Sequence, residues 1–462
     1  MGLRKGDLVE LHIEKMAHGG QGVARLDGFV LFVRGGVPGD RIRARVVRKK
    51  KDYAEANILE IIESSPDRIT APCPYSGFCG GCQWQHVRYE QQLQYKKGII
   101  EESLQRIGGL PGVPVHDVLP SDRPFGYRNK MEFSFSDRRW LLPEEMERGD
   151  AGEDFALGLH VPGAFSKVLD IEACLLQHEQ GNRILQEVKA YAKFSGVPVY
   201  GLKSHEGFWR FLTLRTALHG NEWMVNIVTS EEGRDLLEPL AETLCRRFDN
   251  ISTVVNNINR RRAGIALGES EVLLRGGGTL RDGIGPFMFQ ISANSFFQTN
   301  TLGAERLYNK VIEYAGLKGT EKILDLYSGT GTIPIFLSRH AGEVIGMEIV
   351  EEAVRDAEKN CEANGINNCR FVIGDIRDSL AGLDLKPDVL IVDPPRAGMH
   401  KDVLARVMEI AAEKVVYVSC NPATLARDLG IMSESYEVAE IQPVDMFPQT
   451  YHVEAVARLL RR

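Results

Sequence analysis

The sequence has no apolar run of about eighteen residues, the length that a helix needs to cross a bilayer. Its first residues, MGLRKGDLVELHIEKM, are charged, and they lack both the apolar core of a signal peptide and the Ser or Thr of a myristoylation signal. The chain also contains no internal repeat and no low-complexity segment. We therefore expect a globular, cytoplasmic protein without a membrane partner.

The chain lacks the excess of positive charge that is the simplest sign of a nucleic-acid-binding protein. Its 462 residues carry a formal net charge of −7. The charge is uneven, because residues 1–62 contain twelve Lys and Arg but only eight Asp and Glu. Many of these basic residues lie in RIRARVVRKKK, from Arg41 to Lys51. Phosphate binding needs a local basic patch of this kind, although a solvated strand edge explains the stretch equally well.

Cysteine is too scarce and too unevenly placed for a disulfide framework. The chain has eight cysteines, and three of them fall within ten residues, in CPYSGFCGGCQWQH. Such clustering in a cytoplasmic protein favours an iron–sulfur cluster or a zinc site. Cys73, Cys79 and Cys82 would supply three ligands. The best fourth ligand is Cys174, and the second choice is His86, which would favour zinc.

A chain of this length predicts several domains, since it is too long for one hydrophobic core. Residues 1–63 alternate apolar and polar side chains between glycines, which predicts a small antiparallel β-barrel. Residues 64–282 contain the cysteine-rich segment, an amphipathic helix near 90–110, and strands mixed with a helix near 178–195, which predicts an α+β domain. In residues 283–462 apolar strands alternate with helices. This pattern predicts an α/β domain with a doubly wound parallel sheet and ligands at the carboxyl ends of its strands.

The first strand of the α/β domain runs into a glycine-containing turn, KILDLYSGTGT. Glycines at such a turn let the backbone approach a ligand closely. About twenty residues later the next strand ends in Glu348, which could hold the ribose hydroxyls of an adenosine. Pro334 stands where a dinucleotide fingerprint would have its third glycine. The pattern therefore favours a nucleoside cofactor, with Asp375 at the end of FVIGD as an adenine contact.

Three further motifs follow at the same predicted edge of the sheet. They are DPPRAG, which contains Asp393, SCNP, which contains Cys420, and HVEA, which contains Glu454. The two prolines make the first loop a rigid platform for a planar base. Most lone cysteines that end an apolar strand are inert core residues, but Cys420 lies at the ligand edge. A glutamate in an apolar strand is costly to bury unless it has a partner or a task.

These residue types fit methyl transfer to C5 of uracil. C5 is too weak a nucleophile to attack a methyl sulfonium unaided, whereas a thiolate that adds to C6 converts the ring into an enolate. After the transfer, a base must remove the C5 proton before the cysteine can leave. Cys420 is the candidate nucleophile and Glu454 the candidate base, and the target uridine must leave its stack to reach them.

In content and order these motifs resemble the TrmA-like RNA (uracil-5-)-methyltransferases, especially the bacterial 23S rRNA members with a TRAM domain and an iron–sulfur cluster. The resemblance covers nearly the whole chain. The N-terminal strands resemble a TRAM, OB-like RNA-binding barrel, the cysteine segment resembles the cluster-binding segment, and DLYSGTGT, DPPRAG, SCNP and HVEA follow in family order. It implies a class I, Rossmann-like domain that uses S-adenosylmethionine, and an RNA rather than a DNA partner.

The resemblance also implies roles for individual residues. Cys73, Cys79, Cys82 and Cys174 would hold a [4Fe–4S] cluster, Cys420 and Glu454 would be catalytic, and Phe296, Gln298 and Asp393 would lie beside the target base. The S-adenosylmethionine site would consist of Gln298, Tyr327, Gly329, Thr332, Glu348, Asp375 and Asp393. Thr332 departs from the family pattern, because several relatives have Asn there. The family also suggests that the helix near 90–110 packs on the catalytic domain.

Other functions stay open at this point. A cytosine-5 RNA methyltransferase is disfavoured by Glu454 and the cysteine pattern, and a non-catalytic iron–sulfur RNA-binding protein by the presence of both catalytic residues. A nicotinamide reductase is disfavoured by the incomplete glycine fingerprint. Large-subunit rRNA is favoured as the substrate because the TRAM-like strands and the cysteine segment occur together, and tRNA is the alternative. We expect a monomer to be sufficient for activity.

Overall fold

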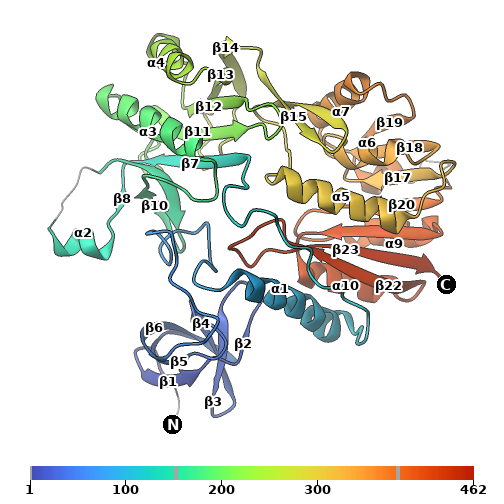
Figure 1. Cartoon of the computed structure of the whole chain (residues 1–462), viewed down its shortest axis with the longest axis horizontal. Helices are drawn as coiled ribbons and strands as arrows, with labels where there is room; N and C mark the ends of the chain where they lie inside the picture. The colour runs from blue at the N-terminus through green and yellow to red at the C-terminus, as the bar shows by residue number, and fades with distance from the viewer. Residues whose placement is uncertain (1–2, 150–153, 381–385) are drawn as a thin grey trace.

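The computed structural model describes residues 3–149, 154–380 and 386–462. Within these residues the strands form a six-stranded, an eight-stranded, a two-stranded and a seven-stranded sheet. Figure 1 shows three lobes, one for each of the larger sheets, arranged around a central region where segments from all three meet. No helix in the described ranges is long and apolar enough to cross a membrane.

The N-terminal lobe is a curled six-stranded sheet. Alternation of side chains is clearest in the fifth strand, where Ile42, Ala44 and Val46 are buried and the arginines between them face solvent. The strands pair in the order β1-β5-β6-β4-β3-β2, so the described residues form a strand-rich domain without a closed hydrogen-bonded barrel. The strands are β1 (Leu8–His12), β2 (Lys15–Met16), β3 (Gly22–Leu26), β4 (Phe29–Arg34), β5 (Arg41–Lys49) and β6 (Tyr53–Glu63).

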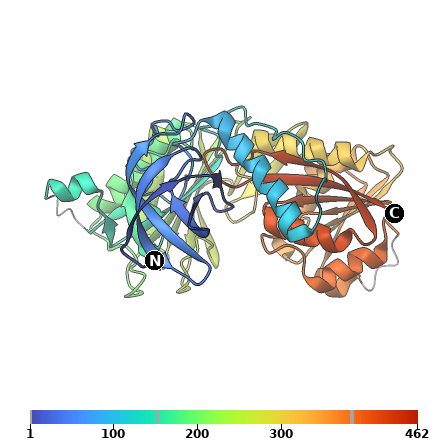
Figure 2. The same cartoon turned by 90° about the horizontal axis from the view of Figure 1, so that it is seen from below.

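Helix α1 (Tyr89–Ser103) connects this lobe to the C-terminal one, as Figures 1 and 2 show. It continues into a π-helical turn, Leu104–Gly108, and ends where Gly109 adopts the left-handed conformation. Ile100 and Leu104 belong to the hydrophobic core that includes α10 (Pro422–Met432). The contact is close, because a Cβ on Gly108 would lie 2.6 Å from the carbonyl oxygen of Ala426.

The central lobe is built on the eight-stranded sheet, which has the order β14-β13-β12-β11-β7-β9-β10-β8. Helices α3 (Glu179–Phe194) and α4 (Arg234–Arg247) bury their apolar sides against this sheet. A short helix, α2 (Pro143–Glu147), precedes the part of the acidic loop that lies outside the described residues. The strands are β7 (Lys130–Ser136), β8 (Arg139–Trp140), β9 (Ala156–Val161), β10 (Ala164–Asp170), β11 (Trp209–Thr216), β12 (Trp223–Thr229), β13 (Ile251–Ile258) and β14 (Ser270–Gly276).

The C-terminal lobe is a doubly wound sheet with the order β19-β18-β17-β20-β21-β23-β22, which confirms the predicted fold class. Helices on both faces enclose two separate hydrophobic cores. The strand order reverses direction between β17 and β20, the position at which sheets of this type bind ligands. Its strands are β17 (Lys322–Leu326), β18 (Glu343–Glu348), β19 (Cys369–Ile373), β20 (Val389–Val392), β21 (Lys414–Ser419), β22 (Tyr436–Val444) and β23 (Glu454–Arg461).

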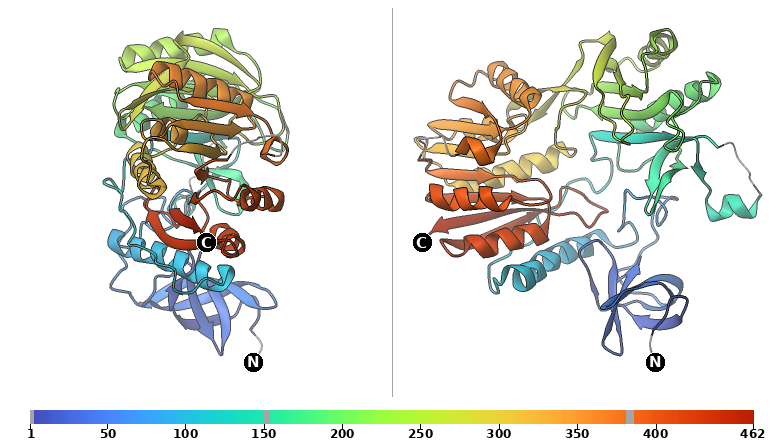
Figure 3. Two further views of the ribbon diagram at one scale, coloured as in Figure 1. Left: turned by 90° about the vertical axis from the view of Figure 1, so that its right-hand side faces the viewer. Right: turned by 180° about the vertical axis from the view of Figure 1, so that it is seen from behind.

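The end of this sheet departs from the parallel pattern. β23 runs antiparallel to both of its neighbours, β21 and β22. A two-stranded ribbon, β15 (Thr279–Ile284) with β16 (Phe287–Ser292), leads from the central lobe into the C-terminal one. The helices of the lobe besides α10 are α5 (Thr301–Ala315), α6 (Thr332–Ser338), α7 (Glu351–Ala363), α8 (Ile376–Ser379) and α9 (Lys401–Ile410), and Figure 3 shows the layers from two further directions.

Candidate active site

A cavity of about 780 Å³ opens at the carboxyl edge of the seven-stranded sheet. Its walls come from the loop after β16, the turn after β17, and the ends of β18, β20, β21 and β23. Nine residues assigned from the sequence line it: Phe296, Gln298, Tyr327, Gly329, Thr332, Glu348, Asp393, Cys420 and Glu454. Asp375, the remaining one of the cofactor set, lies in an adjoining cavity.

Three neighbouring strands bring the two candidate catalytic residues and Asp393 together. Asp393 directly follows β20, Cys420 directly follows β21, and Glu454 is the first residue of β23. Ser419 of β21 pairs with Ala455 of β23, so the next position outward brings Cys420 opposite Glu454. The antiparallel direction of β23 is essential, because the start of that strand lies at the edge where the parallel strands end.

Burial controls the protonation of these three groups. Desolvation raises the pKa of Glu454 to about 8, with a further contribution from Asp393 and an opposing one from the Arg396 guanidinium. Desolvation also raises the pKa of Asp393 to about 7. The thiol of Cys420 has its pKa raised to about 11 by burial and then by the two carboxyls. The site therefore concentrates acidic groups that lack a strong cationic partner, and a cationic ligand would ease their ionisation.

The turn after β17 is shaped by left-handed backbone. Tyr327 has φ of +68°, which is uncommon for a residue with a side chain, and Gly329 and Gly331 also have positive φ. The N–H of Gly329 donates to Glu348 Oε2 at 2.9 Å. The other carboxylate oxygen of Glu348 accepts from the N–H groups of Ile349 and Val350, both at 2.9 Å. The predicted ribose-binding carboxylate is thus held in one orientation.

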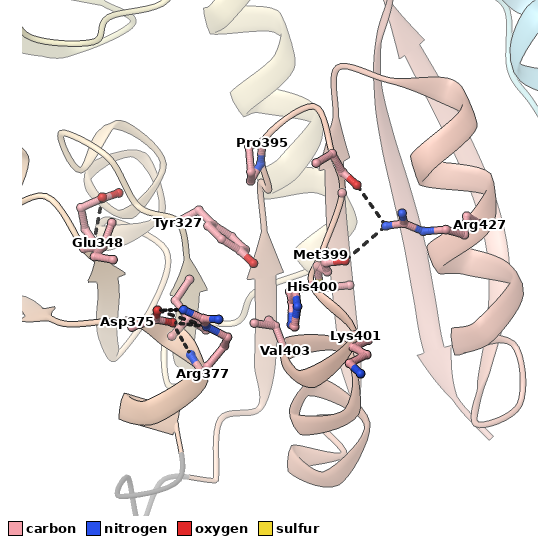
Figure 4. A pocket seen from close by; sticks show the side chains of 14 residues that line it. Tyr327, Glu348, Asp375, Arg377, Pro395, Met399, His400, Lys401, Val403 and Arg427 are labelled. Atoms are coloured by element: carbon pink, nitrogen blue, oxygen red, sulfur yellow. Dashed lines mark hydrogen bonds and ion pairs between the residues drawn. The ribbon is translucent and has the colours of Figure 1, made fainter.

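The second cavity, of about 620 Å³, extends the first along the edge of the sheet. Both cavities are lined by Tyr327, Glu348 and Pro395, so they adjoin at these residues. At the far side, the guanidinium of Arg377 donates from Nε to both oxygens of Asp375, at 3.0 and 3.1 Å, as Figure 4 shows. This pairing lowers the pKa of Asp375 to about 2. An ionised carboxylate beside an apolar-lined cavity suits the amino edge of an adenine.

Two further lining residues differ in how freely their side chains can move. The side chain of Phe296 is 69% exposed although it lies in the cavity, so its ring is free to stack on a flipped base. The hydroxyl of Thr332, at the start of α6, lies 3.0 Å from the hydroxyl of Tyr308. Thr332 therefore offers the cavity a hydroxyl that is held by a buried tyrosine.

Asp325 carries a buried carboxyl to which none of the sequence motifs assigns a role. Both of its carboxylate oxygens are buried without a hydrogen-bond partner in the described part of the chain. Burial and the nearby carboxylates Asp393 and Glu348 raise its pKa well above the ordinary value. Such a group is expensive to keep in a fold without a ligand or a task. The signal was present in the sequence, since Asp325 interrupts the apolar strand KILDL.

The four predicted cluster ligands come together although Cys174 is far from the others in sequence. Burial raises the pKa of Cys79 to about 11 and that of Cys82 to about 12, and the thiols of Cys73 and Cys174 raise both further. The cleft that contains the first three also contains His86, whose Nε2 is buried and has no hydrogen-bond partner among the residues that the structure describes. Among the described residues, no three His, Cys, Asp or Glu side chains adopt an arrangement that could hold a metal ion.

The basic stretch of β5 is partly paired within its own sheet. Arg41 forms an ion pair with Glu63 at 2.5 Å, and Arg43 forms one with Glu60 at 2.9 Å. Both glutamates lie on β6, the strand next to β5. Part of the positive charge that suggested phosphate binding is therefore balanced locally.

Comparison with known proteins places both ends of the chain in described families. The TRAM domain model matches residues 3–59, and the tRNA (Uracil-5-)-methyltransferase model matches residues 279–462. An uncharacterized RNA methyltransferase of Chlorobaculum tepidum is 43% identical over 98% of this chain and 96% of its own length. Another uncharacterized RNA methyltransferase, from Halalkalibacterium halodurans, is 37% identical over 99% of this chain and 98% of its own length.

A solved structure is similar over the whole length. The tRNA (uracil-54, C5)-methyltransferase of Pyrococcus abyssi, in complex with S-adenosyl-L-homocysteine, is 31% identical to this chain. The match covers 98% of this chain and 99% of the other, with a TM-score of 0.77. The similarity therefore extends over the N-terminal, central and C-terminal lobes alike.

Proposed function

The chain belongs to the TrmA-like RNA (uracil-5-)-methyltransferase family, and from this we propose that it methylates C5 of a uridine in 23S rRNA through a covalent bond between Cys420 and C6 of the uracil. Membership confirms the predicted (uracil-5-)-methyltransferase family, the methyltransferase fold with a strand-rich TRAM domain, and the enzyme class. The chain is an S-adenosylmethionine-dependent RNA methyltransferase. The RNA target, the covalent step and the residue roles are our proposal.

One observation carries the proposed mechanism: the ends of β21 and β23 bring a thiol and a carboxyl into the same cavity. Cys420 gives its thiol proton to the ionised carboxyl of Asp393, its sulfur adds to C6 of the uracil, and the ring electrons move to form an enolate. S-adenosylmethionine supplies the methyl group that C5 then accepts. Glu454 takes the proton from C5, the C5–C6 double bond re-forms, and the electrons of the S–C6 bond return to sulfur.

The remaining lining residues bind and orient the two substrates. Phe296 stacks on the flipped uracil, and Gln298 and Asp393 lie beside its polar edge. We assign the adenosine part of S-adenosylmethionine to the cavity between Glu348 and Asp375, with Tyr327, Gly329 and Thr332 along the way to the reacting end. The unpartnered carboxyl of Asp325, beneath this turn, supports a cationic ligand nearby.

We propose that Cys73, Cys79, Cys82 and Cys174 hold a [4Fe–4S] cluster. The donor types support this, since the four thiols lie near enough to interact electrostatically and thiolates are the ligands that iron–sulfur clusters use, although the described side chains are not arranged as a metal site in this structure. Iron and sulfide analysis of anaerobically purified protein tests this, and Cys174→Ser should lower the iron content of the folded protein. Zinc in place of iron would instead favour a site with His86 as a ligand.

A tRNA uridine is the second candidate substrate. It is favoured by the full-length similarity to an enzyme whose described substrate is tRNA. We favour 23S rRNA because the TRAM domain and the cysteine segment occur in one chain. We further propose that the protein acts as a cytoplasmic monomer, with domains at 1–63, 64–282 and 283–462.

The test uses unmodified 23S rRNA and tRNA transcripts with methyl-tritiated S-adenosylmethionine. The wild type should form 5-methyluridine in one of them, Cys420→Ala should be inactive, and Glu454→Gln should accumulate a covalent protein–RNA adduct. Methylation by Cys420→Ala would overturn the covalent mechanism. If neither transcript is methylated by the wild type, the proposed substrates are wrong, and a non-catalytic RNA-binding role becomes the better explanation.

A further inference from the structure

The loop of residues 445–453 joins β22 to β23 and directly precedes Glu454. We call it the base loop. Its residue Phe447 lines the active cavity, as does Glu454 at the end of the loop. Figure 1 shows this segment extending from the C-terminal lobe toward the N-terminal half of the chain. The position of Glu454 therefore depends on how the base loop is held.

Helix α1 supplies the strongest contact to the base loop. Lys96 Nζ donates to Asp445 Oδ1 at 2.5 Å and to the carbonyl oxygen of Phe447 at 3.0 Å. Both charged side chains are 0% exposed. The other oxygen of Asp445 accepts from the hydroxyl of Tyr89 at 2.8 Å. A buried ion pair with this many hydrogen bonds holds its two partners in one geometry.

A second contact lies one turn earlier on the same face of the helix. The side-chain amides of Gln92 and Gln449 meet, with Gln92 Nε2 donating to Gln449 Oε1 at 3.0 Å. The backbone N–H of Gln449 donates back to Gln92 Oε1 at 3.0 Å. Gln449 has φ of +68°, a conformation that a residue with a side chain keeps only when its surroundings hold it. The base loop is thus held at Gln449, where its backbone adopts the left-handed conformation.

The cysteine segment reaches the same residue. The backbone N–H groups of Gln83 and Trp84, which directly follow Cys82, both donate to the carbonyl oxygen of Gln449 at 3.0 Å. Residues 89, 92 and 96 lie on one face of α1, since they are three and four positions apart. The base loop is consequently held by segments more than 340 residues away in the sequence, none of which lines the active cavity.

We propose that Tyr89, Gln92 and Lys96 are positioning residues for proton abstraction: they hold the base loop so that Glu454 reaches the C5 proton after methyl transfer. This inference rests on the proposed function. Loss of these contacts should slow the release of Cys420 from the methylated base more than it slows the attack of Cys420 on C6. If these residues served folding alone, their loss would lower the rates of both steps together.

The matched pair of variants is Lys96→Met and Lys189→Met. Lys189 makes the same kind of contact in the central lobe, with Nζ donating at 2.7 Å to Asp170 and to the carbonyl oxygen of Ile171, far from the base loop. Lys96→Met should lower kcat about 10- to 100-fold and raise the fraction of enzyme trapped as methylated adduct. Lys189→Met should not raise that fraction. Lys96→Arg should restore part of the turnover.

Two milder measurements guard against a variant that merely unfolds. Gln92→Leu removes no charge and should show the same rise in adduct with a smaller loss of kcat. Addition to 5-fluorouridine RNA needs Cys420 but leaves no C5 proton for Glu454 to remove, so Lys96→Met, Gln92→Leu and Lys189→Met should each form this adduct at the wild-type rate.

The outcomes separate the two hypotheses. If the wild type makes 5-methyluridine and Glu454→Gln traps the adduct, but Lys96→Met and Gln92→Leu do not, the positioning role is wrong while the proposed function stands. A loss of 5-fluorouridine adduct in proportion to kcat would also overturn it, because the defect would then precede proton abstraction. If Glu454→Gln itself traps nothing, the proposed mechanism fails first.

Discussion

Binding of S-adenosylmethionine should release protons from the active site, whereas S-adenosylhomocysteine should not. In the free protein, burial gives Glu454 a pKa of about 8 and Asp393 a pKa of about 7. At pH 7.5 the two carboxyls together therefore hold about one proton. The reacting sulfonium must lie close to both, since C5 of the uracil accepts the methyl group and presents its proton to Glu454.

The size of the effect follows from the charge of the sulfonium. At about 6 Å and an effective dielectric constant of about 20, a unit charge interacts with a carboxylate by about 2.8 kcal/mol. Screening by the rest of the site reduces this, so each pKa should fall by about one to two. The pair should then release about 0.7 to 1 proton per bound molecule at pH 7.5. S-adenosylhomocysteine has a neutral thioether in the same place and should leave both carboxyls unchanged.

Isothermal titration calorimetry in buffers of different ionisation enthalpy measures the number of protons directly. Both ligands carry the same amino-acid part, so the difference in the number of protons that they release measures the effect of the sulfonium. In Glu454→Gln only Asp393 remains, and the difference should fall to about 0.2 proton, because Asp393 is mostly ionised at this pH. Equal proton release by both ligands would refute the electrostatic reasoning, as would an undiminished difference in Glu454→Gln.

Four further predictions concern pH and packing. With S-adenosylmethionine well below saturation, kcat/KM reports the free enzyme and should rise with pH through about 8 as Glu454 ionises; a plateau already reached at pH 6 would contradict this. The pKa of Glu454 is higher in the folded than in the unfolded state, so the protonated carboxyl stabilises the fold and this contribution is lost as pH rises toward 8. The urea midpoint of unfolding should therefore fall with pH more steeply in the wild type than in Glu454→Gln. Gly331→Ala should weaken binding of S-adenosylhomocysteine, measured by calorimetry, because its Cβ would lie 2.8 Å from Phe371 and φ is +76°, and unchanged affinity would show that the turn does not shape the cofactor site. Gly108→Ala should cost about 1–3 kcal/mol in urea unfolding, since its Cβ would meet Ala426 of α10, and a neutral result would mean that α1 can shift away.

The sequence predicted the ligand edge well because each motif there follows an apolar strand. The residues after β17, β18, β20 and β21 lie at one edge whenever those strands are parallel, so Tyr327, Glu348, Asp393 and Cys420 could be grouped without knowledge of the strand order. Asp375 was assigned to the same site but lies in the adjoining cavity, and its clamp by Arg377 was missed. Asp375 and Arg377 are two residues apart in sequence, and they meet because Asp375 caps the short helix α8.

Other features depend on pairings that no local pattern specifies. The charge of Arg41 and Arg43 is balanced by Glu63 and Glu60 only in the register that β5 and β6 adopt. Lys96 was visible as one charged residue of an amphipathic helix, yet its partner Asp445 is 349 positions away. A lysine on such a helix is normally solvated, so burial of this pair could not be inferred from the helix pattern.

The same argument explains why the catalytic pair needs the last hairpin of the sheet. Parallel strands end at the ligand edge, so each can deliver a residue only through the loop that follows it. Glu454 is delivered differently, as the first residue of β23, because that strand starts where β21 ends. This arrangement requires the base loop, the nine residues 445–453 between β22 and β23. The loop lies at the edge of the sheet that carries the cavity and is held by contacts from outside the sheet. Helix α1 and the cysteine segment provide that support, which links the N-terminal half of the chain to the position of the base.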